Sequence, residues 1–215
     1  MNKVNAVPFH EKSYWESRFE KEKHFEWLLK WDNIKTELEP YLDKDEDVLH
    51  LGCGSSELAF DIADSGYKNI VNVDYAENVI EYMKSVTYEK QQQNGNYSNL
   101  SWISGNCLHN LKSYLPKEKY SIIIDKGLVD TIACGDDDDQ SQVKRLSNEM
   151  LSVAKSGAYW ISISFSGERK FYADNQEHFY WKTEQRIPIE VPQPNDKPGA
   201  PAVYYYLYIN HKARA

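Results

Sequence analysis

The segment Leu51-Gly52-Cys53-Gly54-Ser55 joins two glycines to small side chains directly after an apolar run. Glycine lets the backbone approach a ligand closely, and the free N–H groups at the start of a following helix bind anionic or polar groups. A bare G-x-G is weak, because turns contain it by chance. Asp74 follows Gly52 by 22 positions and strengthens the signal. An acid there accepts hydrogen bonds from both ribose hydroxyls, so the pair predicts an adenosine-containing cofactor. Asp74 can also cap the helix that starts at Ala76, and the two roles are compatible.

Gly105-Asn106-Cys107 follows a third apolar segment, at the point where an adenine ring would lie. The side-chain oxygen of Asn106 can accept a hydrogen bond from the exocyclic amine of adenine. The alternative is an ordinary loop asparagine that forms an Asx turn.

Asp125 and Lys126 end the strand predicted over residues 120–125, and Asp130 follows in the same loop. A carboxylate here can stabilise a cation or an incoming amine, and the lysine can contact the cofactor or position the loop. An Asp–Lys pair on the surface is the alternative for the first two residues. Upstream, an aromatic lid has four candidates, Trp15, Phe19, Phe25 and Trp27, because ring faces attract cations, although core packing explains most of these residues equally well.

Other chemistries lack their motifs. The six histidines show no metal-ligand spacing such as H-E-x-x-H, so we expect no metal. Neither a G-x-S-x-G elbow nor a Walker loop occurs, which argues against an esterase and a P-loop enzyme. Cys53, Cys107 and Cys134 are odd in number and far apart, which predicts reduced thiols rather than disulfides.

Strands and helices are predicted to alternate along most of the chain. Helices are expected within Tyr14 to Leu42, before the first strand. The sheet strands are predicted over 47–51, 69–73, 100–104, 120–125 and 158–165. The intervening helices are predicted to start at Ser55 or Ser56 and end at Gly66, and to cover 76–88 and 143–154, with loops at 91–99 and 136–139 and a break at Gly157. Two last strands, 180–191 and 203–210, flank a proline-rich loop at 192–201 and predict a long hairpin.

This order predicts an α/β fold with a mainly parallel sheet, helices on both faces, and an antiparallel element at the edge. We expect a single domain over 1–215. It comprises an N-terminal helical cap (1–45), a cofactor-binding βα core (46–165) and a C-terminal hairpin region (166–215). A dinucleotide-binding dehydrogenase would continue with a second α/β half, for which 215 residues leave no room. Length and hairpin therefore favour S-adenosylmethionine over NAD.

Composition limits the partners. Hydrophobic residues make up 41% and charged residues 27%, and the apolar runs are too short to span a bilayer. A net charge of -8 argues against nucleic acid, which is bound through lysine and arginine. The N-terminus shows neither a secretory signal nor a convincing transit peptide. We therefore expect a cytoplasmic protein, with no membrane or nucleic-acid partner, that acts on a protein or a small molecule.

Five segments together resemble the methyltransferase-like protein-lysine methyltransferases, above all those that modify translation elongation factor 1-alpha. They are YWESRF (14–19), LHLGCGSSELAF (49–60), NVDYAENVI (72–80), IIIDKGLVDTI (122–132) and YYLYINHK (205–212). The Asp-Lys-Gly block is much more specific to this group than the glycine loop. The resemblance implies a Rossmann-like class I methyltransferase with a seven-stranded sheet and a C-terminal antiparallel hairpin. It also implies a monomer that uses S-adenosylmethionine, with a protein substrate such as that elongation factor.

The resemblance further implies which residues form the site. Asp125 and Asp130 are candidates to orient the substrate amine. The implied cofactor contacts are Trp15, Phe19, Gly52, Gly54, Asp74, Tyr75, Asn106, Cys107 and Lys126. Two departures from the family pattern stand out: Phe19 and Phe25 replace tyrosines, and Asn106 replaces an aspartate. A small-molecule N- or O-methyltransferase and a non-catalytic binding module remain alternatives.

Overall fold

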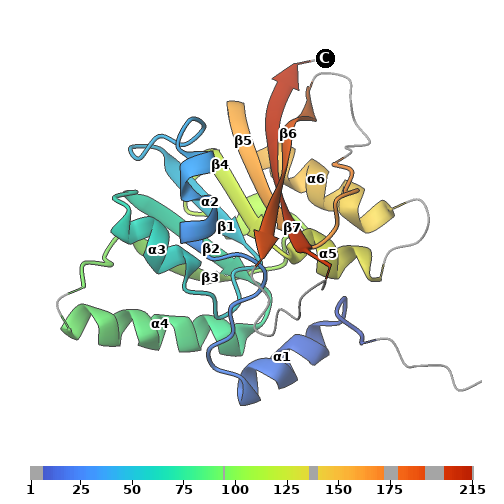
Figure 1. Cartoon of the computed structure of the whole chain (residues 1–215). Helices are drawn as coiled ribbons and strands as arrows, with labels where there is room; N and C mark the ends of the chain where they lie inside the picture. The colour runs from blue at the N-terminus through green and yellow to red at the C-terminus, as the bar shows by residue number, and fades with distance from the viewer. Residues whose placement is uncertain (1–6, 94, 136–139, 172–178, 192–200, 215) are drawn as a thin grey trace, which may run out of the picture.

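The computed structural model describes residues 7–93, 95–135, 140–171, 179–191 and 201–214. Within these ranges a seven-stranded sheet has the order β3-β2-β1-β4-β5-β7-β6 (Figure 1). Strands β1 to β5 are mutually parallel, whereas β7 is antiparallel to both of its neighbours. The strands are β1 (Asp47–Leu51), β2 (Asn69–Asp74), β3 (Leu100–Ser104), β4 (Tyr120–Lys126), β5 (Ala154–Ser164), β6 (Phe179–Val191) and β7 (Val203–Arg214).

Helices cover both faces of this sheet, because the central strands are apolar on both sides. Leu49 packs with η1 and α6, whereas its neighbour Val48 packs with α2 and α3 on the opposite face. The unbroken run Ile122-Ile123-Ile124 in β4 likewise divides between the two cores. The helices are α1 (Lys12–Lys21), α2 (Trp31–Leu38), α3 (Leu58–Asp64), α4 (Glu77–Gln92), the 3-10 helix η1 (Leu111–Tyr114), α5 (Leu128–Ala133) and α6 (Ser141–Val153).

The predicted fold class is confirmed, several element boundaries differ from the predictions, and Asp130 lies on helix α5 and not in a loop. Helix α4 continues to Gln92, four residues past the predicted end. Strand β5 already begins at Ala154, so Gly157 is not a break before the strand. Gly157 has φ +74°, and the β4–β5 register shifts between Tyr120 and Ile122, as in a bulge that bends a strand without ending it. In the hairpin the antiparallel strand β7 lies inside the sheet, and β6 takes the edge.

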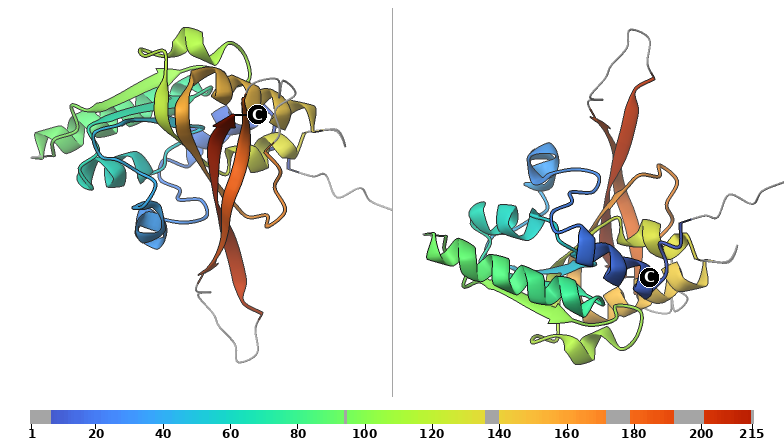
Figure 2. Two further views of the ribbon diagram at one scale, coloured as in Figure 1. Left: turned by 90° about the horizontal axis from the view of Figure 1, so that it is seen from above. Right: turned by 90° about the horizontal axis from the view of Figure 1, so that it is seen from below.

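Segments outside the described residues include 136–139 and most of the predicted proline-rich loop. On either side of that loop, β6 and β7 extend past the other strands as a two-stranded ribbon (Figure 2). Among the described helices, none combines the length and the apolarity that a bilayer crossing demands.

The topology brings the candidate site residues to one edge. Parallel strands β1, β2, β3 and β4 end on the same side of the sheet, where α3, α4 and α5 begin (Figure 1). Helix α1 lies apart from the sheet and packs on α4, where Asn78 Nδ2 donates to the Glu16 carbonyl at 2.8 Å. The N-terminal segment thereby covers the edge at which ligands bind in open α/β sheets.

Candidate cofactor site

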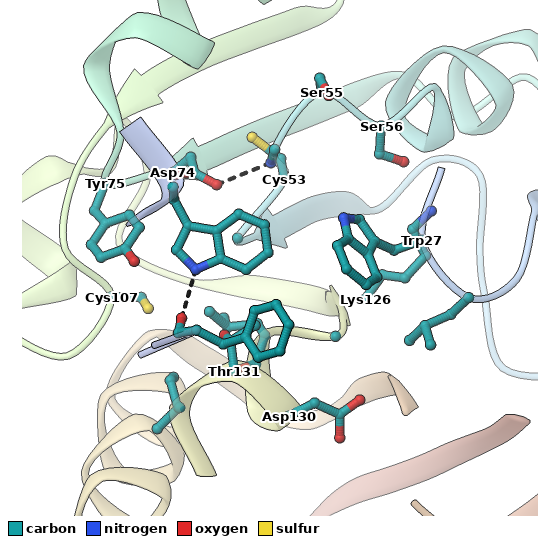
Figure 3. Close-up of a pocket in the computed structure, with 18 of the residues that line it drawn as sticks. Trp27, Cys53, Ser55, Ser56, Asp74, Tyr75, Cys107, Lys126, Asp130 and Thr131 are labelled. Carbon is teal, nitrogen blue, oxygen red and sulfur yellow. Dashed lines mark hydrogen bonds between the residues drawn. The ribbon is translucent and has the colours of Figure 1, made fainter. Parts of the chain in front are cut away.

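A cavity of about 630 Å³ lies at this edge, under the N-terminal segment (Figure 3). Loops after β1, β2, β3 and β4 form its floor, and the segments around α1 and before α2 form its wall. All but one of the predicted site residues line it. Those that do are Trp15, Phe19, Gly52, Gly54, Asp74, Tyr75, Asn106, Cys107, Lys126 and Asp130.

The glycine loop after β1 needs its glycines for conformation and for space. Gly52 and Gly54 have φ +62° and +50°, in the left-handed region that side chains disfavour. A Cβ on Gly52 would lie 2.9 Å from Leu128 Cδ1 at the start of α5. The loop therefore presents bare backbone to the cavity, as a cofactor that packs against the chain requires.

Asp74 ends β2 with its carboxylate in the cavity. Oδ2 accepts from the Gly54 amide and Oδ1 from the Ala76 amide, each at 3.0 Å. A carboxylate has about four acceptor positions, so each oxygen keeps one for a ligand hydroxyl. Burial raises the pKa of Asp74, and hydrogen bonds from backbone amides oppose that rise by stabilising the charged form. The residue thus holds the amide of Ala76, the residue just before α4, without acting as a side-chain cap of that helix, and it fits a ribose at the same time.

The loop after β3 supplies neutral polar groups. Asn106 Oδ1 accepts from the Leu108 amide at 2.9 Å, so the Asx turn considered above does form, and one lone pair remains for an adenine amine. Burial raises the pKa of the Cys107 thiol to about 12 and, together with the Asp74 charge, raises the pKa of Tyr75 as well. Both side chains line the cavity uncharged at neutral pH.

An aromatic wall closes the cavity on the N-terminal side. The rings of Trp15 and Phe19 lie 5.7 Å apart, and those of Trp15 and Trp27 lie 6.0 Å apart. Trp15 Nε1 donates to the Phe9 carbonyl at 2.6 Å, and the Arg18 guanidinium lies 4.7 Å from the Trp27 ring. The structure therefore brings together rings that the sequence indicated as a lid, and Trp27 is among the residues that line the cavity (Figure 3).

Lys126 ends β4 with a side chain that is only 4% exposed. Its ammonium contacts the carboxylate of Glu26 and lies 3.4 Å from the Leu29 carbonyl. Burial lowers the pKa of Lys126 to about 7, and the Glu26 carboxylate lies in contact with its nitrogen. Sequence reasoning missed Glu26, because an acid among the charged residues of the N-terminal region has no distinguishing pattern.

Asp125 is the predicted site residue that does not line the cavity. It is 0% exposed, and its carboxylate accepts from Trp160 Nε1 at 2.7 Å and from the Val129 amide at 3.3 Å. Burial raises its pKa to about 7 against these bonds. The expectation that Asp125 meets the substrate amine does not agree with this placement, because strand β4 turns its side chain into the core beneath α5.

Asp130 on α5 does line the cavity, and three donors orient it. Oδ2 accepts from the Phe165 amide at 3.0 Å, and Oδ1 accepts from Arg169 Nε at 2.8 Å and from the Ser164 hydroxyl. One of its four acceptor positions remains, on Oδ2. The carboxylate is thus held rigidly with one free position, which suits an acceptor that orients a donor group.

His50 in β1 is a second residue that sequence reasoning missed. It lines the cavity, and its Nδ1 lies 3.0 Å from Asn72 Oδ1. Since Asn72 Nδ2 donates to the Ser101 carbonyl, Oδ1 is the acceptor and Nδ1 carries the proton. Nε2 is buried and finds no partner among the described residues. Burial lowers the pKa of His50 to about 4, so the ring is neutral at physiological pH.

His50 and Asp125 predict opposite effects of pH on stability. The pKa of His50 is about 4 when folded and 6.5 ordinarily, so the unfolded chain gains a proton first and stability falls below pH 6.5. The pKa of Asp125 is about 7 when folded and 3.8 ordinarily, so the folded chain gains a proton first and stability rises below pH 7. Between pH 8 and 5.5 these contributions are about 1 and about 2 kcal/mol.

Urea unfolding at pH 8 and 5.5 tests this pair. His50→Asn retains a donor for Asn72 but cannot titrate. On going from pH 8 to pH 5.5 its free energy of unfolding should therefore rise more than that of the wild type. Asp125→Asn should show the reverse. Equal pH dependence in all three proteins would show that neither group has a shifted pKa.

Comparison with known proteins agrees with this geometry. A sheet of this order, with a glycine loop after β1 and an acid at the end of β2, defines a class I S-adenosylmethionine-dependent methyltransferase. The chain belongs to the family described as methyltransferase domain, whose model matches residues 42–197. The prediction of an S-adenosylmethionine-dependent methyltransferase is therefore confirmed.

Relatives differ in how much of their length the chain covers. It is 32% identical to methyltransferase srdJ of Neurospora crassa, over 94% of this chain and 83% of that protein. It is 30% identical to the human eEF1A lysine and N-terminal methyltransferase, over 71% of this chain but only 21% of that protein. It is 22% identical to mouse EEF1A lysine methyltransferase 4, over 94% of this chain and 75% of that protein.

Solved structures share the fold at low identity. Magnesium protoporphyrin IX methyltransferase of Synechocystis, with bound S-adenosylmethionine, has a TM-score of 0.60 at 11% identity and covers 99% of this chain and 100% of its own. N-methyltransferase NodS of Bradyrhizobium japonicum, with bound S-adenosylhomocysteine, has a TM-score of 0.58 at 11% identity and covers 96% and 99%.

Proposed function

We propose that this methyltransferase modifies the ε-amine of a lysine in a protein, and that translation elongation factor 1-alpha is the first substrate to test. The observation that carries the proposal is the oriented carboxylate of Asp130, which lines the cavity from the block that resembles the lysine methyltransferases. The names of the human and mouse relatives support the same substrate.

The residues of the site fit the cofactor. Asp74 has two acceptor positions for the ribose hydroxyls, Gly52 leaves room against Leu128, and Asn106 keeps a lone pair for adenine. When bound, the cofactor supplies an electrophilic methyl group on a sulfonium. The aromatic wall excludes water and attracts cationic groups through its ring faces.

The amine is the harder partner to activate. A lysine with a pKa of about 10.4 is neutral in only on the order of one molecule in a thousand at physiological pH. Removal from water lowers that pKa, and the free position on Asp130 Oδ2 accepts a hydrogen bond that aligns the nitrogen. A proton can leave to a carboxylate through water. Asp125 does not contact the amine. It accepts a hydrogen bond from the Val129 amide and thereby fixes the start of α5, the helix that carries Asp130.

A small-molecule N- or O-methyltransferase is the second candidate. The structural neighbours favour it, because one is an N-methyltransferase and another a magnesium protoporphyrin IX methyltransferase. The cofactor half of the site is common to both candidates. The acceptor end of the cavity, lined by Asp130, Phe165 and Tyr205, is where they must differ.

Radiolabelled S-adenosylmethionine and an extract from cells that lack this protein distinguish the two candidates. We expect label on a protein band of the size of elongation factor 1-alpha and, by mass spectrometry, on a lysine. Asp130→Asn should retain cofactor affinity but lower the rate of transfer at least tenfold, because the amide offers the amine a weaker acceptor.

The control is Asp45→Asn, which alters a surface acid that pairs with Lys68. Label that appears only in the small-molecule fraction would overturn the lysine proposal in favour of the second candidate. Cofactor binding without any transfer would indicate a non-catalytic binding module. Undiminished transfer by Asp130→Asn would remove that residue from the mechanism.

A further inference from the structure

Glu26 joins three parts of the molecule at the edge of the cavity. It lies in the segment between α1 and α2, and its carboxylate contacts the ammonium of Lys126 at the end of β4. The same carboxylate accepts from Ser56 Oγ at 2.8 Å and from the Glu57 amide at 3.0 Å, just before α3. These donors come from two elements of the cofactor site, so one side chain ties the N-terminal segment to both.

The ion pair with Lys126 is buried, so the lysine ammonium requires a nearby counter-ion. An ammonium that is only 4% exposed loses most of its hydration, and a buried charge left without a counter-ion is strongly destabilising. Glu26 supplies the counter-charge, and the Leu29 carbonyl, 3.4 Å away, faces the same nitrogen. The chain from Glu26 to Leu29 thus wraps around the lysine head group.

The wrapped segment forms the cavity wall. Phe25, Glu26, Trp27 and Leu28 all line the cavity. Leu28 has φ +60°, a left-handed conformation that is unfavourable for a residue with a side chain. Such strain persists only where the surroundings impose it. Here the segment is held at one end by the Glu26 carboxylate and at the other by Leu29, which is 2% exposed.

We propose that Glu26 is a positioning residue, whose charge locks the wall segment 25–28 onto Lys126 and the start of α3 and thereby sets the affinity for the cofactor. The wall can keep its strained shape only while the carboxylate holds it. This inference rests on the cofactor site and is independent of which acceptor is methylated.

Two variants separate charge from packing. Glu26→Gln keeps the size and loses the charge, whereas Glu26→Asp keeps the charge and shortens the side chain. We expect the Kd for S-adenosylhomocysteine, measured by calorimetry on the full chain, to rise at least tenfold in Glu26→Gln and only about threefold in Glu26→Asp. A residue that served only to fill space would show the opposite order.

A double-mutant cycle with Lys126→Gln tests the partner. If Glu26 acts through Lys126, then Glu26→Gln should change the Kd less than twofold in the Lys126→Gln background. Glu20→Gln, an exposed acid on α1, is the matched control and should bind like the wild type. An unchanged Kd in Glu26→Gln would overturn the proposal. So would a double variant whose Kd rises by the product of the two single-variant factors, because Glu26 and Lys126 would then act independently. Thermal unfolding of each variant shows whether it is folded. If Glu26→Gln does not fold, the expected threefold rise in the Kd of Glu26→Asp still tests the proposal.

Discussion

Asp74→Asn should weaken the binding of S-adenosylmethionine by a hundredfold or more while the fold persists. The carboxylate offers one free acceptor position on each oxygen for the ribose hydroxyls, beyond the Gly54 and Ala76 amides that it already accepts. An asparagine replaces one oxygen with an NH₂ group, which would face a backbone donor. A hydrogen bond to a charged group contributes about 1.5 to 3 kcal/mol. Losing the charge-assisted bonds to both ribose hydroxyls would therefore lower the affinity by a hundredfold or more. Isothermal titration calorimetry measures it directly.

The comparison for Asp74→Asn is the surface variant Asp45→Asn, which should bind the cofactor like the wild type. Circular dichroism and thermal unfolding establish that both variants are folded. If Asp74→Asn bound within threefold of the wild type, the ribose would have to lie elsewhere, and the assignment of this edge of the cavity would be wrong.

Gly52→Ala should abolish most cofactor binding and also destabilise the protein. The new methyl group would lie 2.9 Å from Leu128 Cδ1 and 3.0 Å from Leu128 Cβ, closer than ordinary contacts, so the Leu128 side chain, the start of α5 or the β1 loop must shift. The backbone at φ +62° adds about 1 kcal/mol of strain. We expect a loss of about 1 to 3 kcal/mol in the free energy of unfolding, since overpacking typically costs this much, and at least a tenfold higher Kd.

Gly66→Ala separates these two effects. Gly66 follows α3 with φ +94°, and an added Cβ would meet only the Lys44 side chain, at 3.6 Å. This variant should therefore lose stability through backbone strain and still bind the cofactor normally. Equal loss of affinity in both glycine variants would mean that instability, and not the shape of the loop, explains the result for Gly52→Ala.

The order of strands and helices was predictable because local patterns carry it. Buried parallel strands read as short apolar runs, such as Ile122-Ile123-Ile124, and glycines end the segments between them. Gly157 misled the prediction of β5, since glycine serves equally as a break and as a bulge. Only the pairing of β5 with β4 shows which one it is.

The cofactor site was predictable where the local sequence spacing indicates both a residue and its role. The loop around Gly52 and the acid at Asp74 follow from the spacing of a βαβ unit, and the structure places both at the cavity. Glu26 and His50 carried no such signal. Their partners lie far along the chain, at Lys126 and Asn72, and no local pattern reveals a contact over such a separation.

The sequence by itself determined the class of fold, an adenosine-containing cofactor and the strand ends that hold it, because these depend on periodicity and on spacing within single βα units. The tertiary structure alone decided what each side chain faces. Asp125 and Asp130 are five positions apart in one block, yet the first points into the core toward Trp160 and the second into the cavity. Successive side chains of a strand point to opposite faces of the sheet, and the helix that follows begins a new orientation. Only the packing of β4 and α5 therefore decides where Asp125 and Asp130 point.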